Sequence, residues 1–398
     1  MNVLIIGTTD VLGGAAKVSW ELKEALEAQG NEVSMFVADK RSSDHRVHVI
    51  PRPMWRKYLG FLLGTESLIS TDWILDTEEF KKADLVHCHN LHGRYFNLST
   101  LQKMSLTKPV VWTLHDEWAL TPHCAYTLEG TEMKNGLYVC PSIDTAPRIL
   151  WDNSARLARA RTKIYAAAKL HIVTPSKWLM DRTLKTILAK QDVRLIPNGI
   201  DTTGFVQKNK AEARRALNLP EDKKIILFLA NDAKDNTWKG WVYTERLIQK
   251  YRDRDDVLFL CVGNLRDHEP EPNVRYVGHV SGAENLSQYY SAADALLFTS
   301  IAENFPLVIL EAMSCGLPIV SFDVGGVAEA VTHHENGYVA GYKDEVGIAQ
   351  GIEWVLTLSL VERERIASAS SNKVRQEYDK AAMVERYFAL YTELLGHG

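Results

Sequence analysis

Residues 299–326 read TSIAENFPLVILEAMSCGLPIVSFDVGG, and this stretch decides the fold. The apolar run 295–298 just before it predicts a buried strand, and 319–322 predicts a second one. Residues 307–313 between them are apolar on all sides, which is typical of a buried helix. A strand, a buried helix and a further strand in succession predict one unit of a parallel α/β sheet.

Two carboxylates frame this predicted helix. Glu311 lies inside the apolar run, where an ionised carboxylate is costly unless it meets hydrogen-bond donors. If the helix begins near Glu303, with Asn304 as its cap and Pro306 in its first turn, both carboxylates project to one side. Helix-terminal amides suit phosphate and carboxylates suit hydroxyls, which favours a nucleotide-sugar site. An acidic residue near a helix start plus a buried structural Glu explains the pattern equally well.

The same alternation of strands and helices runs through the whole chain and starts anew near residue 190. The first half opens with a strand at 2–6 and a turn containing Gly13 and Gly14, but it lacks the G-x-G-x-x-G spacing of dinucleotide-binding proteins. Predicted strands ending near His87 and Leu114 bring histidines to the same sheet edge as that turn. Carboxyl ends of parallel strands are where such sheets bind ligands, so we expect a site there.

Composition and charge indicate a globular cytoplasmic protein. The chain has 398 residues, 46% hydrophobic and 24% charged, with a net charge of −4, so nucleic acid is not an expected partner. No apolar run is long enough to span a bilayer, and MNVLIIG at the start resembles a strand and not a signal peptide. Residues 51–75 mix aromatic and basic side chains; this segment either packs on its own domain or contacts the inner face of the membrane peripherally.

The five cysteines are scattered, and we expect reduced thiols and no metal site. His87, Cys88, His89 and His92 include the usual zinc ligands, but neighbours on a strand point in opposite directions. Cys124 and Cys140, with a single histidine near them, cannot complete a four-ligand site.

Several motifs together resemble one enzyme family. The segment ENFPLVILEAMSCGLPIV at 303–320 is similar to the pattern E-x-F-x-L-x-x-x-E-A-M-x-x-G-x-P of the retaining GT-B glycosyltransferases of family 4, and PNGID at 197–201, TPS at 174–176 and Y-x-x-A-D at 290–294 also match. His115-Asp116-Glu117-Trp118, followed by a loop with cysteines, resembles enzymes of bacterial exopolysaccharide synthesis.

The resemblance implies a fold and a domain organisation. It implies two Rossmann-like α/β domains that face each other across a cleft. Residues 1–190 would form the acceptor-side domain, residues 191–380 would bind the nucleotide-sugar donor, and 381–398 would cross back to the first domain.

The resemblance also implies roles for particular residues. Glu311 would hold the donor ribose, Glu303 would contact the donor sugar, and the backbone around Phe305, Pro306 and Leu307 would lie near the diphosphate. The predicted catalytic residues are His115, Lys239 and Glu303. The predicted donor-binding residues are Gly13, Gly14, Lys234, Lys239, Asn304, Phe305, Pro306, Leu307 and Glu311; those on the acceptor side are His89, Asn90 and Asp116. Lys234 stands where the family usually has an arginine, so its charge is kept but bidentate recognition is not.

The implied reaction moves a sugar from a nucleoside diphosphate, UDP or GDP, to a hydroxyl of a saccharide or lipid-linked saccharide, with retention of configuration. No cofactor and no metal are expected. Two alternatives stay open: a GT-B nucleotide-sugar epimerase or hydrolase, and a non-catalytic binder of nucleotide sugars that serves as an assembly partner.

Overall fold

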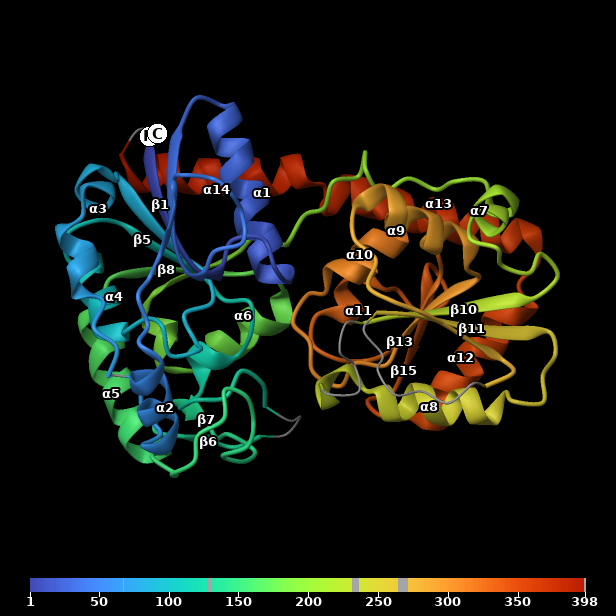
Figure 1. Cartoon of the computed structure of the whole chain (residues 1–398), viewed down its shortest axis with the longest axis horizontal. Helices are drawn as coiled ribbons and strands as arrows, with labels where there is room; N and C mark the ends of the chain where they lie inside the picture. Colours follow the sequence, from blue (N-terminus) through green and yellow to red (C-terminus); the bar gives the residue numbers. More distant parts are fainter. Residues whose placement is uncertain (67, 128–130, 231–235, 264–270, 397–398) are drawn as a thin grey trace. The chain divides into compact units, whose positions relative to one another are not determined.

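The computed structural model describes residues 1–66, 68–127, 131–230, 236–263 and 271–396. The chain forms two compact units, shown in Figure 1. The first unit is Met1–Asn198 together with Met383–Gly398, and the second is Gly199–Ala382. Each is an α/β unit built on a parallel sheet.

The first unit is organised around a seven-stranded sheet whose neighbouring strands all run parallel. The strands in spatial order are β3 (Val47–Val49), β2 (Glu32–Asp39), β1 (Asn2–Thr9), β4 (Leu85–Cys88), β5 (Val110–Thr113), β8 (Leu170–Thr174) and β9 (Asp192–Leu195). The helices are α1 (Gly14–Ala28), α2 (Met54–Leu62), α3 (Glu78–Lys82), α4 (Leu98–Ser105), α5 (Ser154–Ala167), α6 (Lys177–Thr183) and α14 (Lys380–Leu394). A small antiparallel pair, β6 (Met133–Lys134) and β7 (Leu137–Tyr138), lies apart from this sheet.

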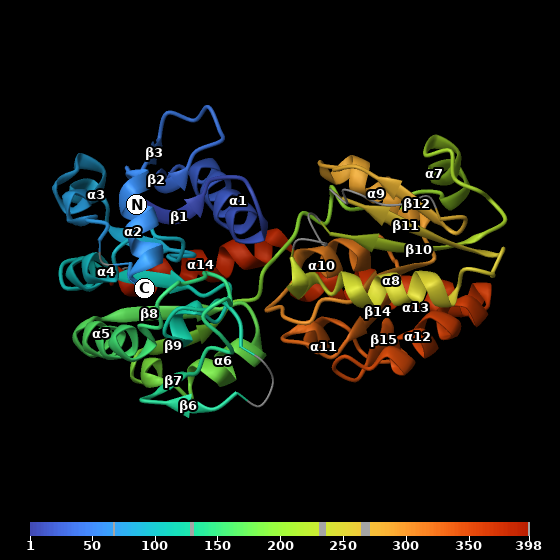
Figure 2. The ribbon, with the colours of Figure 1, turned by 60° about the horizontal axis from the view of Figure 1, so that its bottom comes forward.

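The second unit has a six-stranded parallel sheet, which Figure 2 shows among its helices. Its strands in spatial order are β12 (Val274–Val277), β11 (Val257–Val262), β10 (Lys224–Leu229), β13 (Ala295–Phe298), β14 (Ile319–Phe322) and β15 (Gly337–Ala340). The helices are α7 (Lys210–Ala216), α8 (Trp241–Lys250), α9 (Ala283–Ala292), α10 (Leu307–Ser314), α11 (Val327–Ala330), α12 (Glu345–Thr357) and α13 (Leu360–Glu377). The strands predicted at 295–298 and 319–322 are therefore present.

The first unit extends beyond residue 190. The strand β9, which follows that position, pairs with β8 through the register His171↔Asp192 to Thr174↔Leu195. Since its backbone hydrogen bonds belong to the first sheet, the division comes after Asn198.

The strand order reverses at one place in each sheet. In the first unit β1 lies between β2 and β4, and in the second unit β10 lies between β11 and β13. In each sheet, the connections that follow the two central strands run in opposite directions. The loops after β1 and β4 therefore diverge at the carboxyl ends of these strands, and so do the loops after β10 and β13. Open α/β sheets bind ligands at such a reversal.

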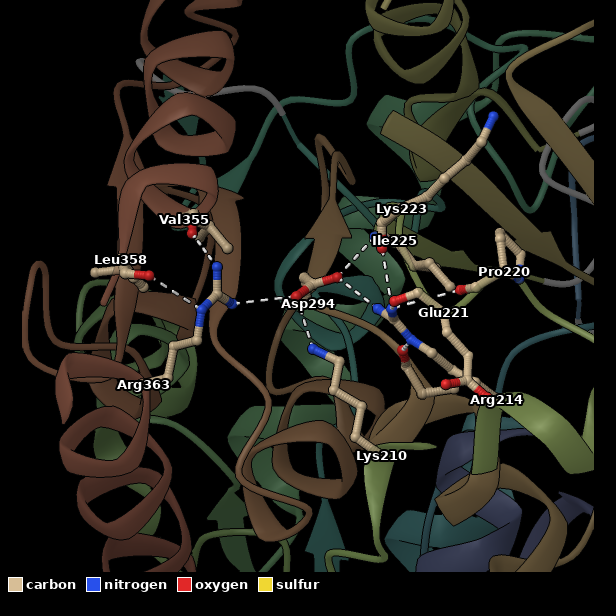
Figure 3. A network of polar contacts seen from close by, with 11 residues as sticks. Lys210, Arg214, Pro220, Glu221, Lys223, Ile225, Asp294, Val355, Leu358 and Arg363 are labelled. Carbon is tan, nitrogen blue, oxygen red and sulfur yellow. Dashed lines mark hydrogen bonds and ion pairs between the residues drawn. The ribbon is translucent and has the colours of Figure 1, made fainter. Parts of the chain in front are cut away.

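Asp294, just before β13, fixes the register at the opposite end of the second sheet. Its carboxylate accepts hydrogen bonds from the backbone amide of Ile225 at 2.7 Å, Lys210 Nζ at 2.6 Å, Arg214 Nη2 at 2.8 Å and Arg363 Nη1 at 3.3 Å (Figure 3). The amide of Asp294 donates in turn to the carbonyl of Ile225 at 2.7 Å. Burial alone would raise the pKa of Asp294, but the cations and the amide lower it.

The last helix, α14, completes the core of the first unit (Figure 1, red among the blue elements). The hydroxyl of Tyr391 lies 2.6 Å from Nδ1 of His87 on β4, and the hydroxyl of Tyr387 lies 2.9 Å from Oγ1 of Thr113 on β5. Thr113 Oγ1 is also 2.8 Å from Nε2 of His87. Burial lowers the pKa of His87 to about 3, with a smaller contribution from His115.

We predict that Asp294→Asn lowers the free energy of unfolding by about 3 kcal/mol, because the substitution leaves buried Arg214 without its counter-charge. Urea unfolding measures this loss. Asp256→Asn is the matched control; the ion pair of Asp256 with Arg254 is exposed to solvent, so a loss under about 1 kcal/mol is expected. Equal effects of the two substitutions would contradict the role given to Asp294.

A second prediction concerns acid pH. The folded-state pKa of His87 lies near 3, below the ordinary value, so the unfolded chain binds a proton on this residue between pH 6.5 and 3 while the folded chain does not. His87 makes its full contribution to the free energy of unfolding above pH 6.5, and at pH 5 this contribution is smaller by about 2 kcal/mol. Between pH 7 and pH 5, the free energy of unfolding of His87→Gln should therefore fall by about 2 kcal/mol less than that of the wild type, as urea unfolding measures. The control His45→Gln, at an exposed position, should follow the wild type; a wild-type loss in His87→Gln would refute the prediction.

Candidate functional site

The loops after β10 and β13 are joined at the reversal of the second sheet. Gly240 has a φ of +67°, and a Cβ on it would lie 1.9 Å from the carbonyl oxygen of Thr299, so only glycine fits this approach. The amide of Ile301 donates to the carbonyl of Trp238 at 2.8 Å. The hydroxyls of Thr244 and Thr299 are 2.9 Å apart. These contacts hold the turn carrying Lys239 against the loop carrying Glu303.

Lys239 and Glu303 form an ion pair. Nζ of Lys239 donates to Oε1 of Glu303 at 2.6 Å; Lys239 keeps a third of its side chain exposed, while Glu303 is nearly buried. Gly325 also approaches this loop closely, because a Cβ on it would lie 1.9 Å from the carbonyl oxygen of Glu303. The structure thus brings two of the three predicted catalytic residues together.

The helix after this loop is the one predicted at 307–313, but its cap differs from the predicted one. α10 begins at Leu307 with Pro306 at its cap position, so Asn304 is not the helix cap. The residue before a proline avoids helical geometry, which keeps Phe305 outside the helix. The argument that places Glu303 and Glu311 on one helical face is therefore wrong, because Glu303 lies in the loop. The helix ends at Ser314, one residue beyond the predicted 307–313, and Gly316 follows it with a φ of +72°.

Leu307, Phe305 and Asn304 are buried around this helix start, and Pro306 is half-buried. The ring of Phe305 packs against Tyr378, with centroids 5.2 Å apart. The first amides of a helix have no acceptor within it. The backbone amides of residues 307 and 308 are therefore donors suited to an anion, whereas Pro306 has no N–H.

Glu311 projects from α10 and is 5% exposed. Its Oε2 accepts a hydrogen bond of 2.9 Å from the hydroxyl of Tyr290 on α9. Burial, and then the charge of Glu311, raise the pKa of Tyr290, which keeps this hydroxyl a donor. The carboxylate predicted inside an apolar run thus meets a donor. Lys234, also predicted to bind the donor, lies outside the described residues.

In the first unit, Gly13 and Gly14 form an open turn at the reversal between β1 and β4. A Cβ on either glycine would meet no atom within 4 Å, and Gly13 has a φ of +96°. Asp10 holds the turn by accepting hydrogen bonds from the amides of Arg41 and Ser42 at 2.9 and 2.8 Å. A cavity of about 240 Å³ lies at this turn. Its lining includes Gly13, Gly14, His89, Asn90 and His92.

His89 and His115 meet beside this cavity. Nδ1 of His89 lies 2.9 Å from Nε2 of His115, and their rings are stacked. Nε2 of His89 is buried and has no hydrogen-bond partner among the described residues. Burial lowers the pKa of His115 to about 4 and that of His89 well below the ordinary value, so both rings are neutral near pH 7. Neutral imidazoles can exchange hydrogen bonds with sugar hydroxyls.

Asp116 and Asn90 occupy the same edge. Oδ2 of Asp116 lies 2.8 Å from Nε2 of His92, and its Oδ1 accepts from the amide of Trp118 at 2.9 Å. Burial opposes protonation of His92, but Asp116 outweighs it and raises the pKa of His92. The carbonyl of Asn90 accepts from the hydroxyls of Tyr95 and Thr8. The three predicted acceptor-side residues therefore lie with His115 in one unit.

The cysteines of the loop after Trp118 differ from the expectation of reduced thiols. Cys124 and Cys140 form a disulfide. Their pairing depends on a Cα separation of 5.8 Å that spacing in the sequence does not reveal. Within the described ranges no three His, Cys, Asp or Glu side chains gather as metal ligands.

Tyr290, Thr299 and Asp10 were not recognised as site residues from the sequence. Tyr290 and Asp294 lie in the motif Y-x-x-A-D, four residues apart, so their shared motif was the available signal. Thr299 and Asp10 show their roles only through contacts with Gly240 and with the backbone at 41–42.

Comparisons with known proteins find relatives for both units. The model of Glycosyltransferase Family 4 matches residues 12–203, and that of Glycosyl transferases group 1 matches residues 209–373. A putative colanic acid biosynthesis glycosyl transferase, WcaC of Escherichia coli K12, is 26% identical over 330 residues, which cover 78% of this chain and 76% of WcaC.

Solved structures share the fold. HepE of Anabaena in complex with UDP has a TM-score of 0.72 at 17% identity and covers 99% of this chain and 100% of its own. Sucrose-phosphate synthase of Thermosynechococcus elongatus has a TM-score of 0.71 at 19% identity, with both chains covered completely. With family models on both units and two Rossmann-like sheets, the chain belongs to the GT-B glycosyltransferases of family 4.

Proposed function

We propose that this glycosyltransferase moves a sugar from a nucleoside-diphosphate sugar to a hydroxyl of a saccharide or lipid-linked saccharide in polysaccharide synthesis, with retention of configuration. The observation that carries the proposal is the contact of 2.6 Å between Lys239 and Glu303 at the strand-order reversal. It places a cation and a carboxylate beside the amides of a helix start, which is the set of groups that a sugar diphosphate requires.

The donor is a UDP- or GDP-sugar in this proposal. HepE, which shares the fold, has been solved with UDP and with UDP-glucose, which favours uridine here. Glu311 would accept hydrogen bonds from the ribose hydroxyls, and Tyr290 would orient its carboxylate. The backbone amides of residues 307 and 308 would bind the diphosphate.

Charge stabilisation is the proposed source of catalysis. As the bond to the sugar breaks, negative charge gathers on the departing diphosphate, and Lys239 would leave Glu303 to neutralise it. Glu303, freed from this pair, would accept hydrogen bonds from the sugar hydroxyls. We assign no protein nucleophile: retention would follow from attack on the face that the phosphate leaves. Neither a metal nor a cofactor has a part in this scheme.

The first unit would bind the acceptor. His89, Asn90, His115 and Asp116 lie at one sheet edge. Because burial lowers the pKa of His115 to about 4, its ring would act near pH 7 as a neutral hydrogen-bond partner. The name of WcaC refers to colanic acid synthesis, and a polysaccharide pathway whose acceptors are lipid-linked would place this chain at the inner face of a membrane.

We predict that UDP raises the melting temperature of the wild type and that Glu311→Gln weakens UDP binding about tenfold or more, because a charged acceptor of ribose hydrogen bonds is lost. Glutamine is of equal size and can still accept from Tyr290, so folding is kept. Thermal shift over a UDP titration measures both, with exposed Glu335→Gln as the control. If neither UDP, GDP nor their sugars stabilise the protein, the donor site is wrong.

We predict that Lys239→Ala lowers kcat about 10²-fold or more, because one group that stabilises the leaving diphosphate is removed. Transfer to an acceptor and release of UDP are measured together, and exposed Lys250→Ala serves as the control. A non-catalytic binder would keep its biological activity in Lys239→Ala. Rapid epimerisation or hydrolysis of the donor without acceptor would favour the other alternative.

A further inference from the structure

The helix α2 of the first unit leaves part of its surface exposed. Its sequence MWRKYLGFL is mostly apolar, yet the one residue of the helix that is buried is Gly60. A Cβ on Gly60 would lie 2.7 Å from the carbonyl oxygen of Thr65, so the helix is held closely along this side. Met54, Trp55 and Tyr58 are exposed, and the other residues of the helix, apart from Gly60, are half-buried.

Exposed aromatic and apolar side chains gather on this helix and on the segment beside it. The amide of Leu150 donates to the carbonyl of Phe61 at 3.0 Å, which fixes 150–151 next to α2. Trp55 is 63% exposed and Trp151 is 72% exposed. The α2 patch consists of Met54, Trp55, Tyr58, Leu63, Leu150 and Trp151. Large exposed apolar patches of this kind mark interaction surfaces.

Positive charge surrounds the α2 patch. Residues 51–63 contain three cations and no carboxylate, although Arg52 pairs with Asp39. Residues 146–163 contain five cations and one carboxylate. Of these cations, Arg161 is buried and Arg148 pairs with Asp144. Arg156 and Arg159 are exposed on α5, just after Trp151, and the guanidinium of Arg56 lies over the ring of Trp55 at 5.1 Å. Tryptophan and tyrosine with flanking cations suit the interface of an anionic bilayer.

We propose that the α2 patch docks this protein on an anionic membrane, with Trp55, Tyr58 and Trp151 at the headgroup level and Arg56 and Lys57 on the lipid phosphates. A second copy is the less favoured occupant, because an isologous dimer would press these like charges together. Among the described residues, no helix is long and apolar enough to cross a bilayer. Docking therefore uses a surface.

A short chain of contacts joins the α2 patch to the acceptor-side residues. Glu66, four residues after α2, lies 3.9 Å from Nη2 of Arg161. The guanidinium of Arg161 lies 3.9 Å from the ring centroid of Trp118, whose amide is bonded to Asp116. A docked patch would hold Asp116 at a fixed height above the bilayer. Only one part of this inference rests on the proposed function, namely that docking presents a lipid-linked acceptor to these residues.

The test is co-sedimentation of the full chain with phosphatidylcholine vesicles, with and without phosphatidylglycerol. The wild type should bind the anionic vesicles, and Trp55→Ser/Trp151→Ser should bind about tenfold more weakly because two interfacial side chains are lost. Arg56→Glu/Lys57→Glu should also bind about tenfold more weakly. Leu360→Ser and Arg215→Glu, both at exposed positions of the second unit, are the matched controls and should bind like the wild type.

Binding of the tryptophan variant at the wild-type level would overturn the proposal, as would equal binding to neutral vesicles. A wild-type dimer that Trp55→Ser/Trp151→Ser dissolves would identify a second copy as the occupant instead. The UDP thermal shift separates the two proposals: all these variants should keep it. Vesicle binding without any nucleotide binding would refute the proposed function while leaving the docking surface intact.

Discussion

The second unit depends on one buried carboxylate. The carboxylate of Asp294 accepts a hydrogen bond from the amide of Ile225, and the amide of Asp294 donates one to the carbonyl of Ile225. These two bonds fix the register of β10 and β13 at their amino ends. Lys210, Arg214 and Arg363 compensate for its burial. The loops that carry Lys239 and Glu303 leave the other ends of these same two strands. Asp294, at the opposite end of these strands, thus helps to set the distance of 2.6 Å between Nζ of Lys239 and Oε1 of Glu303.

The loops themselves are positioned by backbone contacts that only glycine permits. Gly240 meets the carbonyl of Thr299, and Gly325 meets that of Glu303, so two turns press on one loop from different directions. This loop is buried although it is irregular, which is expensive for a backbone unless its polar groups are paired. The pairing of Ile301 with Trp238 and of Gly326 with Asn304 supplies these bonds. A rigid loop holds Glu303 in place before any ligand arrives.

Sequence reasoning worked where one local rule decides and failed where distant residues meet. The apolar runs at 295–298 and 319–322 predicted two buried strands, and 307–313 predicted the helix between them. The cap of α10 was misjudged because two local rules compete: Asn304 is a good cap, but Pro306 excludes a helical Phe305. His89 follows β4 and His115 follows β5, so sequence reasoning could expect both at the carboxyl edge of the first sheet. The stacking of their rings, however, depends on packing. The pairing of Cys124 with Cys140 and the contact of Lys239 with Glu303 join residues whose proximity no spacing encodes.

The placement of α14 has a consequence for the order of biosynthesis. The ribosome delivers residues 1–198 first, but Tyr387 and Tyr391, which cover Thr113 and His87, leave it only after the entire second unit. Until then the first sheet exposes a strip of β4 and β5 in which Nδ1 of His87 lacks its partner Tyr391, a state open to wrong association. The amino-terminal unit, although translated first, is thus the last to be finished, and nascent chains halted before residue 383 lack the piece that closes it.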